Sequence, residues 1–126
     1  MASIGSRGEK LDLHFRQGAT FGPVPVRMTA PSEAPIDLTN TTIRAKIRKN
    51  YDNETAYIVD CEIVNAINGQ FAFSVSDETT ATMPCGPTPN DPASTYVWDL
   101  EILFHSDGST MPVFFGTVRV AARAAR

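Results

Sequence analysis

The sequence has only two cysteines, Cys61 and Cys85, and only two histidines, His14 and His105. The cysteines lack the CxxC or Cys/His spacing of a metal site, and two cysteines alone do not form a disulfide framework, so we expect both to remain thiols. With so few nitrogen and sulfur ligands, we expect neither a metal nor another cofactor.

Long apolar runs are also missing. No stretch approaches the roughly 18 apolar residues that a membrane-spanning helix needs, and the opening residues MASIGSRGEK lack the apolar centre of a secretion signal. We therefore expect no membrane partner and no export by such a signal. With 126 residues the chain has the length of one domain.

Catalytic signals are absent from the pattern. Nucleophilic catalysis needs a serine, cysteine or threonine held against a base, usually a histidine, but His14 alternates with apolar strand residues and His105 begins a hairpin turn. Neither GxGxxG nor GxxxxGK[ST] occurs, so no phosphate-binding loop is expected. We therefore predict that the protein is not an enzyme and has no small-molecule substrate.

Cationic side chains are missing from residues 50–118, which carry ten carboxylates and no lysine or arginine. Residues 1–49 hold eight cations and four carboxylates, and residues 119–126 add three arginines, which together give the net charge of -3. Such segregation indicates an interaction surface, because opposite patches can meet on neighbouring copies.

What the chain does have is repeated alternation of apolar and polar side chains, the pattern of strands with one buried face. Leu11, Leu13 and Phe15 begin it, and similar runs occupy 43–48, 57–63, 71–75, 96–104 and 111–121. Pro23 and Pro25 mark residues 20–28 as an edge or irregular strand. About seven strands predict an all-β, single-domain β-sandwich, immunoglobulin-like or jelly-roll-like, over residues 10–120. Residues 1–9 and 121–126 are then an N-terminal arm and a basic C-terminal tail.

Two local features break this regular pattern. Residues 77–83 can form a single helical turn, capped by Ser76 or Asp77. The following segment, 84–92, has four prolines in nine residues, which forbid regular pairing, so we expect it to cross from one sheet to the other. The aromatic residues of the strands are expected in the core.

Seven cations are the candidate partner-binding residues: Arg44, Lys46, Arg48, Lys49, Arg119, Arg123 and Arg126. The first three share one face of a strand. They either pair with Asp60 and Glu62 on a neighbouring strand of the same monomer or contact a partner protein. Nucleic acid is disfavoured, because the isoelectric point is near 5.2 and the aromatic residues fall in the core-facing set.

Four strings carry a resemblance to a known family: LDLHFRQGATF (11–21), PIDLT (35–39), IRAKIR (43–48) and YVWDLE (96–101). Together they resemble short virion structural proteins of tailed bacteriophages, in particular the immunoglobulin-like N-terminal domains of baseplate and fibre-attachment proteins. The similarity extends over roughly 50 of the 126 residues.

The resemblance implies a non-enzymatic virion protein that oligomerises and connects tail, baseplate, neck or fibre components. Its partners would be copies of itself and other phage structural proteins, assembled into the virion in the host bacterial cytoplasm. One alternative is a capsid decoration or cement protein on the head exterior. Another, of a different class, is a carbohydrate-binding module that uses exposed aromatic side chains.

Overall fold

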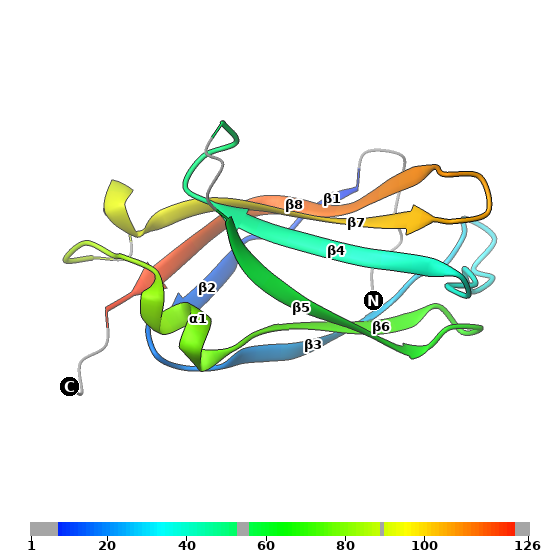
Figure 1. Ribbon diagram of the computed structural model, residues 1–126, viewed down its shortest axis with the longest axis horizontal. Helices are drawn as coiled ribbons and strands as arrows, with labels where there is room; N and C mark the ends of the chain where they lie inside the picture. Colours follow the sequence, from blue (N-terminus) through cyan, green and yellow to red (C-terminus); the bar gives the residue numbers. More distant parts are fainter. Residues whose placement is uncertain (1–7, 53–55, 89, 123–126) are drawn as a thin grey trace.

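The computed structural model describes residues 8–52, 56–88 and 90–122, and within them β-strands dominate (Figure 1). The elements are β1 (Glu9–Lys10), β2 (Leu13–Arg16), β3 (Phe21–Arg27), β4 (Thr41–Arg48), β5 (Ala56–Asn65), β6 (Gln70–Val75), helix α1 (Asp77–Thr82), the 3₁₀ turn η1 (Pro92–Ser94), β7 (Thr95–Phe104) and β8 (Thr110–Ala121). The predicted all-β, single-domain fold is confirmed.

The strands form one curled sheet in the order β1-β8-β7-β4-β5-β6-β3, with β2 also pairing with β8. Figure 1 shows β8, β7 and β4 in the upper layer, while β5 leads down to β6 and β3. The orders β4-β7-β8 and β3-β6-β5 are those of strands C-F-G and B-E-D in an immunoglobulin sandwich. Because β5 pairs with both β4 and β6, the layers are joined as a half-barrel rather than separated as two sheets.

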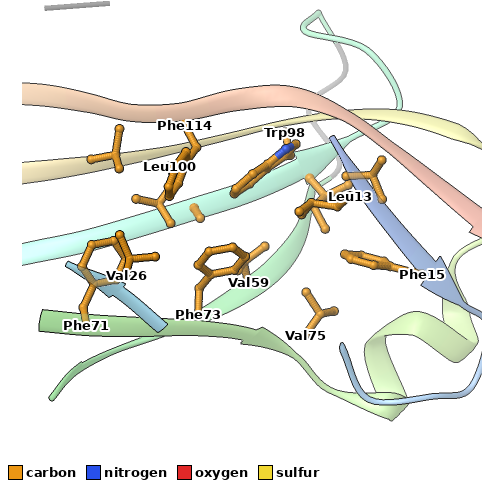
Figure 2. Close-up of a cluster of buried hydrophobic side chains, with 14 of the residues drawn as sticks. Leu13, Phe15, Val26, Val59, Phe71, Phe73, Val75, Trp98, Leu100 and Phe114 are labelled. Carbon is orange, nitrogen blue, oxygen red and sulfur yellow. The ribbon is translucent and has the colours of Figure 1, made fainter. Parts of the chain in front are cut away.

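The core lies between the two layers. Figure 2 shows Trp98 and Phe114 pointing from one layer toward Phe71 and Phe73 of the other. The ring centroids of Phe73 and Trp98 are 5.5 Å apart, and all four side chains are at most 5% exposed. Burial of rings of this size dominates the apolar driving force for folding. The placement of these aromatic side chains in the core is confirmed.

The N-terminal strands β1 and β2 run parallel to β8. Hydrogen bonds of the segment between β1 and β2 hold them there. Between β1 and β2 the indole N–H of Trp98 donates to the carbonyl of Leu11 at 2.7 Å. The backbone N–H and the hydroxyl of Thr117 both donate to Asp12 Oδ1 at 3.0 Å. Gly116 leaves the space for this approach, because a Cβ there would lie 2.3 Å from the Leu11 carbonyl oxygen.

Helix α1 lies at one end of the half-barrel (Figure 1). Ser76 is its N-cap and accepts a hydrogen bond from the backbone N–H of Thr79. Of the two predicted caps, Ser76 and Asp77, the structure therefore has Ser76. The buried Thr80 hydroxyl accepts from the N–H of Gly18 and donates to the carbonyl of Ala19. These bonds attach α1 to the turn between β2 and β3, and the segment after α1 then crosses to β7 as predicted.

The proline-containing strand lies at a sheet edge, as predicted. In β3 the N–H of Met28, just after the strand, points to the carbonyl of Gly69 beside β6. Successive amides of a strand point in opposite directions, so the positions of Pro25 and Arg27 face the free edge. Pro25 has no N–H to offer there, which makes this edge a poor template for a further strand.

The ends of the predicted domain differ from the observed strands by one residue. Glu9, assigned to the arm, pairs with Phe114 as part of β1, and Ala121, assigned to the tail, ends β8. Residues 1–7 of the arm and 123–126 of the tail lie outside the described residues.

Candidate interaction surface

Three of the predicted partner-binding cations lie on the outer side of β4. Arg44, Lys46 and Arg48 alternate with Ala45 and Ile47, which are buried in the core. Side chains two residues apart on a strand share a face, so the three cations form one row. We call Arg44, Lys46 and Arg48 the basic stripe.

The alternative in which Asp60 and Glu62 pair with this stripe inside the monomer is wrong. β4 pairs with β5 only between residues 45–48 and 56–59, and this register puts Ile58 opposite Lys46. Beyond Val59 the strand turns away to pair with β6, where Asp60 and Glu62 lie opposite Ser74 and Ala72. The two carboxylates therefore belong to the other layer, and we call Asp60 and Glu62 the acidic stripe.

The strand that does place carboxylates beside the basic stripe is β7. Glu101 lies opposite Arg44, and Asp99 lies opposite Lys46. Arg44 Nε donates to Glu101 Oε1 at 2.7 Å, and this is the one ion pair within 4 Å in the part of the chain that the structure describes. Both side chains are about half exposed, so solvent screening keeps its contribution small.

A hollow of about 250 Å³ lies on this face between β4 and β7. Its lining includes the whole basic stripe together with Tyr51, Val97, Asp99 and Glu101. Desolvation, with a smaller contribution from Glu101, raises the pKa of Asp99, while Arg48 and Lys46 oppose this shift. Arg48 Nε is buried and has no hydrogen-bond partner among the described residues. The lining thus combines three cations with two carboxylates, one of which is paired with Arg44.

Lys49 has its bonding partners inside the domain. Its ammonium donates to the carbonyls of Pro92 and Thr95, the latter at 2.9 Å, and lies 4.6 Å from the centre of the Tyr96 ring. These contacts join the end of β4 to the start of β7. The structure thus places Lys49 apart from the row formed by the basic stripe.

The other predicted cations lie on or beyond β8. Arg119 is opposite Thr95 on β7 and His14 on β2, at the far side of the same outer face. Its Nε is also buried without a partner among the described residues. Arg123 and Arg126 lie outside the described part of the chain.

Two exposed apolar side chains lie beside the basic stripe. The sequence analysis did not single them out. Ile58 on β5 is 66% exposed, and Tyr51 after β4 is 60% exposed. Ile58 could have been found from the pattern, because it occupies an outward position between the inward Tyr57 and Val59. Tyr51 lies in a turn, where alternation carries no information.

The two histidines of the chain lie at different places in the fold. His14 lies on β2, whereas His105 follows β7, where its Nε2 is hydrogen-bonded to the Thr42 hydroxyl at 2.7 Å. No group of three histidine, cysteine, aspartate or glutamate side chains gathers within the described part of the chain. Burial, reinforced by Asp60, raises the pKa of the Cys61 thiol to about 11, which disfavours the reactive thiolate.

Within the described ranges, no helix is long and apolar enough to cross a membrane. No protein-family model matches the chain, and no curated protein matches it. A functional interpretation therefore depends on the surface geometry and on the sequence strings described above.

Proposed function

We propose that the chain is a non-enzymatic structural protein of a tailed-bacteriophage particle, which oligomerises and connects tail, baseplate, neck or fibre components. The observation that carries this proposal is the set of charged rows on the outer faces of the sheet, of which Arg44 and Glu101 form the one ion pair among the described residues. Lys46 and Arg48 on one layer, and Asp60 and Glu62 on the other, form no ion pair among the described residues. Charged rows of this kind guide specific protein–protein contacts.

The sequence resemblance supports the particle setting. The resembling segments 11–21, 35–39, 43–48 and 96–101 include β2 and the start of β3, the approach to β4, most of β4, and β7. The resemblance implies an immunoglobulin-like domain, and the strand order of this chain agrees with that implication.

This role needs binding surfaces and no catalysis. The proposed partners are other copies of the chain and other phage structural proteins, with no membrane, specific nucleic acid or small-molecule substrate. The proposed location is the virion, after assembly in the host bacterial cytoplasm.

The experiment is quantitative mass spectrometry of purified particles from a phage that encodes this chain, followed by electron cryomicroscopy. We expect the protein in a fixed number of copies per particle, and a non-structural protein from the same lysate provides the control for carry-over. If this protein is present in the infected cell but absent from purified particles, the proposal is refuted.

The same map separates the leading function from the capsid-decoration alternative. A ring about the tail axis supports the connecting role, whereas copies on the threefold or sixfold positions of the shell support decoration of the head. The two sites differ in symmetry, so a single reconstruction distinguishes them.

The carbohydrate-binding alternative lacks its expected platform, because Trp98, Phe71 and Phe73 are buried. Among the described aromatic side chains, the most exposed are Tyr51 and Phe115. We expect the fluorescence of Trp98 to be blue-shifted and unchanged by added glycans. A saturable change with one glycan would favour the binding module instead.

A further inference from the structure

We infer that copies of this chain associate with one another, with the acidic stripe of one copy against Lys46 and Arg48 of another. The inference rests on the proposed function for the claim that the chain oligomerises, and it adds which two surfaces meet. A second copy is favoured as the occupant because one chain carries both surfaces, and their charges and spacings match.

The two stripes lie on strands that pair with different neighbours. Asp60 and Glu62 are exposed on the part of β5 that pairs with β6. Lys46 is exposed on β4, and Arg48 is partly exposed there. In the described residues, neither stripe residue pair has an ion-pair partner within 4 Å, since Arg44 and Glu101 form the single such pair. Asp99 on β7 lies opposite Lys46 and offsets part of the basic side. The acidic stripe has no such cation opposite it on β6, where Asp60 and Glu62 face Ser74 and Ala72.

The charges of the two stripes have the same spacing. Asp60 and Glu62 are two residues apart on an extended strand, as are Lys46 and Arg48. A strand rises about 3.4 Å per residue, so both pairs have the same separation of about 7 Å. When β5 of one copy lies along β4 of another, each carboxylate can therefore face one cation.

The basic stripe lines a hollow that can receive a side chain of another copy. The hollow between β4 and β7 is lined by Lys46 and Arg48 together with Asp99 and Glu101, of which Glu101 is paired with Arg44. Arg48 is partly exposed, so a carboxylate of another copy can meet its side chain at the opening of the hollow, and hydrogen bonds to charged groups are the stronger kind. Ile58, two residues before Asp60 and 66% exposed, adds apolar area beside the acidic stripe.

The geometry allows two types of assembly. Ile58, which shares the outward side of β5 with Asp60, is opposite Lys46 on β4, and β5 then turns away from β4 toward β6 (Figure 1). When each pair of copies makes the contact once, it is heterologous and gives a closed ring or an open filament. When two copies make it reciprocally about a twofold axis, it gives a dimer.

The test compares charge-reversed full-length proteins by sedimentation velocity and native mass spectrometry in about 0.05 M salt. We expect concentration-dependent oligomers for the unchanged chain. The variants Lys46→Glu/Arg48→Glu and Asp60→Lys/Glu62→Lys should each weaken self-association by at least about tenfold, because like charges then face each other.

Two controls separate a specific contact from a general charge effect. Glu33→Lys/Glu78→Lys makes the same change in net charge as reversal of the acidic stripe, at two exposed positions elsewhere, and should associate like the unchanged chain. The fourfold variant that reverses both stripes keeps the net charge of -3 and should regain association. A mixture of the two doubly substituted proteins should also regain it. Far-ultraviolet circular dichroism verifies that each variant is folded.

The results that overturn the inference are clear. The inference is wrong if the unchanged chain stays monomeric at about 1 mM. It is also wrong if neither charge reversal weakens oligomerisation, or if the fourfold variant does not regain it. These outcomes are independent of the particle analysis. If the protein is present in particles but its association ignores the stripes, the proposed function stands and this inference fails. If the chain associates through the stripes but is absent from particles, this inference stands and the proposed function fails.

Discussion

Replacing Gly116 by alanine is expected to detach the N-terminal strands from β8. The new Cβ would lie 2.3 Å from the carbonyl oxygen of Leu11 and 2.9 Å from Asp12 Oδ1, where ordinary contacts begin at 3.4 Å. The segment between β1 and β2 therefore has to move outward by about 1 Å. No flexible side-chain end can absorb this overlap, because the closest atom belongs to the backbone.

The magnitude follows from the bonds that cross this point. The indole N–H of Trp98 donates to the Leu11 carbonyl at 2.7 Å, so an outward shift of that size stretches the bond beyond a useful length. The Trp98 side chain is 1% exposed, so water cannot easily replace the lost acceptor. An unsatisfied buried donor costs about 1–3 kcal/mol. Weakening of the bonds between Asp12 and Thr117 adds to this, and we expect a total loss of about 2–4 kcal/mol in the free energy of unfolding.

Urea unfolding followed by tryptophan fluorescence measures this loss, and hydrogen exchange of residues 9–17 locates it. The matched control is Gly108→Ala, because a Cβ at Gly108 has no described atom within 4 Å. Its positive φ of 74° alone should cost about 1–2 kcal/mol. The proposed role of Gly116 is refuted if the free energy of unfolding of Gly116→Ala is within about 0.5 kcal/mol of that of the unchanged chain and residues 9–17 keep their protection from hydrogen exchange.

Three further predictions concern other local contacts. Ser76→Ala should lower the free energy of unfolding by about 1 kcal/mol through loss of the helix cap, whereas Ser76→Thr should retain most of it in the same urea assay. The hydrogen bonds from Thr117 lower the pKa of Asp12, so its contribution to stability is present above about pH 4 and is lost as the pH falls further; the stability difference between the chain and Asp12→Asn should shrink between about pH 6 and pH 3. Lys49→Met should cost about 1–2 kcal/mol in thermal unfolding, because it removes the carbonyl contacts and the cation–π contact with Tyr96, and Lys49→Arg should recover part of this.

Local patterns predicted most of the strands because burial on one face leaves a direct trace in the sequence. Trp98, Leu100 and Ile102 alternate with Asp99 and Glu101, and all three are buried on β7. Ser76 and the prolines of β3 were equally informative, because helix caps and sheet edges impose chemical requirements on single residues. The strand β1 has only two residues, too few for any periodic pattern.

Pairing between strands could not be predicted in the same way. Alternation shows which side of a strand Lys46 occupies, but it does not identify the strand beside it. Asp60 and Glu62 follow β4 closely in sequence, yet β5 changes partner after Val59 and takes them to the other layer. The same continuous strand explains why the architecture is a half-barrel instead of two separate sheets.

The candidate surface was predicted in part. The outward direction of Arg44, Lys46 and Arg48 follows from the period of the strand and is confirmed. The internal bonds of Lys49 depend on carbonyls more than 40 residues away in sequence, which no local pattern contains. The hollow beside the stripe likewise arises only when β7 lies next to β4.

The parallel arrangement of β1 and β2 along β8 has a mechanical consequence. Glu9 lies beside Phe114 and Arg16 beside Ala121, so the first and last strands keep one register along their common length. Tension that pulls residue 8 and residue 122 apart acts along these strands and loads their hydrogen bonds in shear, all at once instead of one after another. If force were applied at its two ends, the domain would resist extension through the hydrogen bonds of β1 and β2 with β8. The hydrogen bond from Trp98 to Leu11 adds a further connection between β1 and β2.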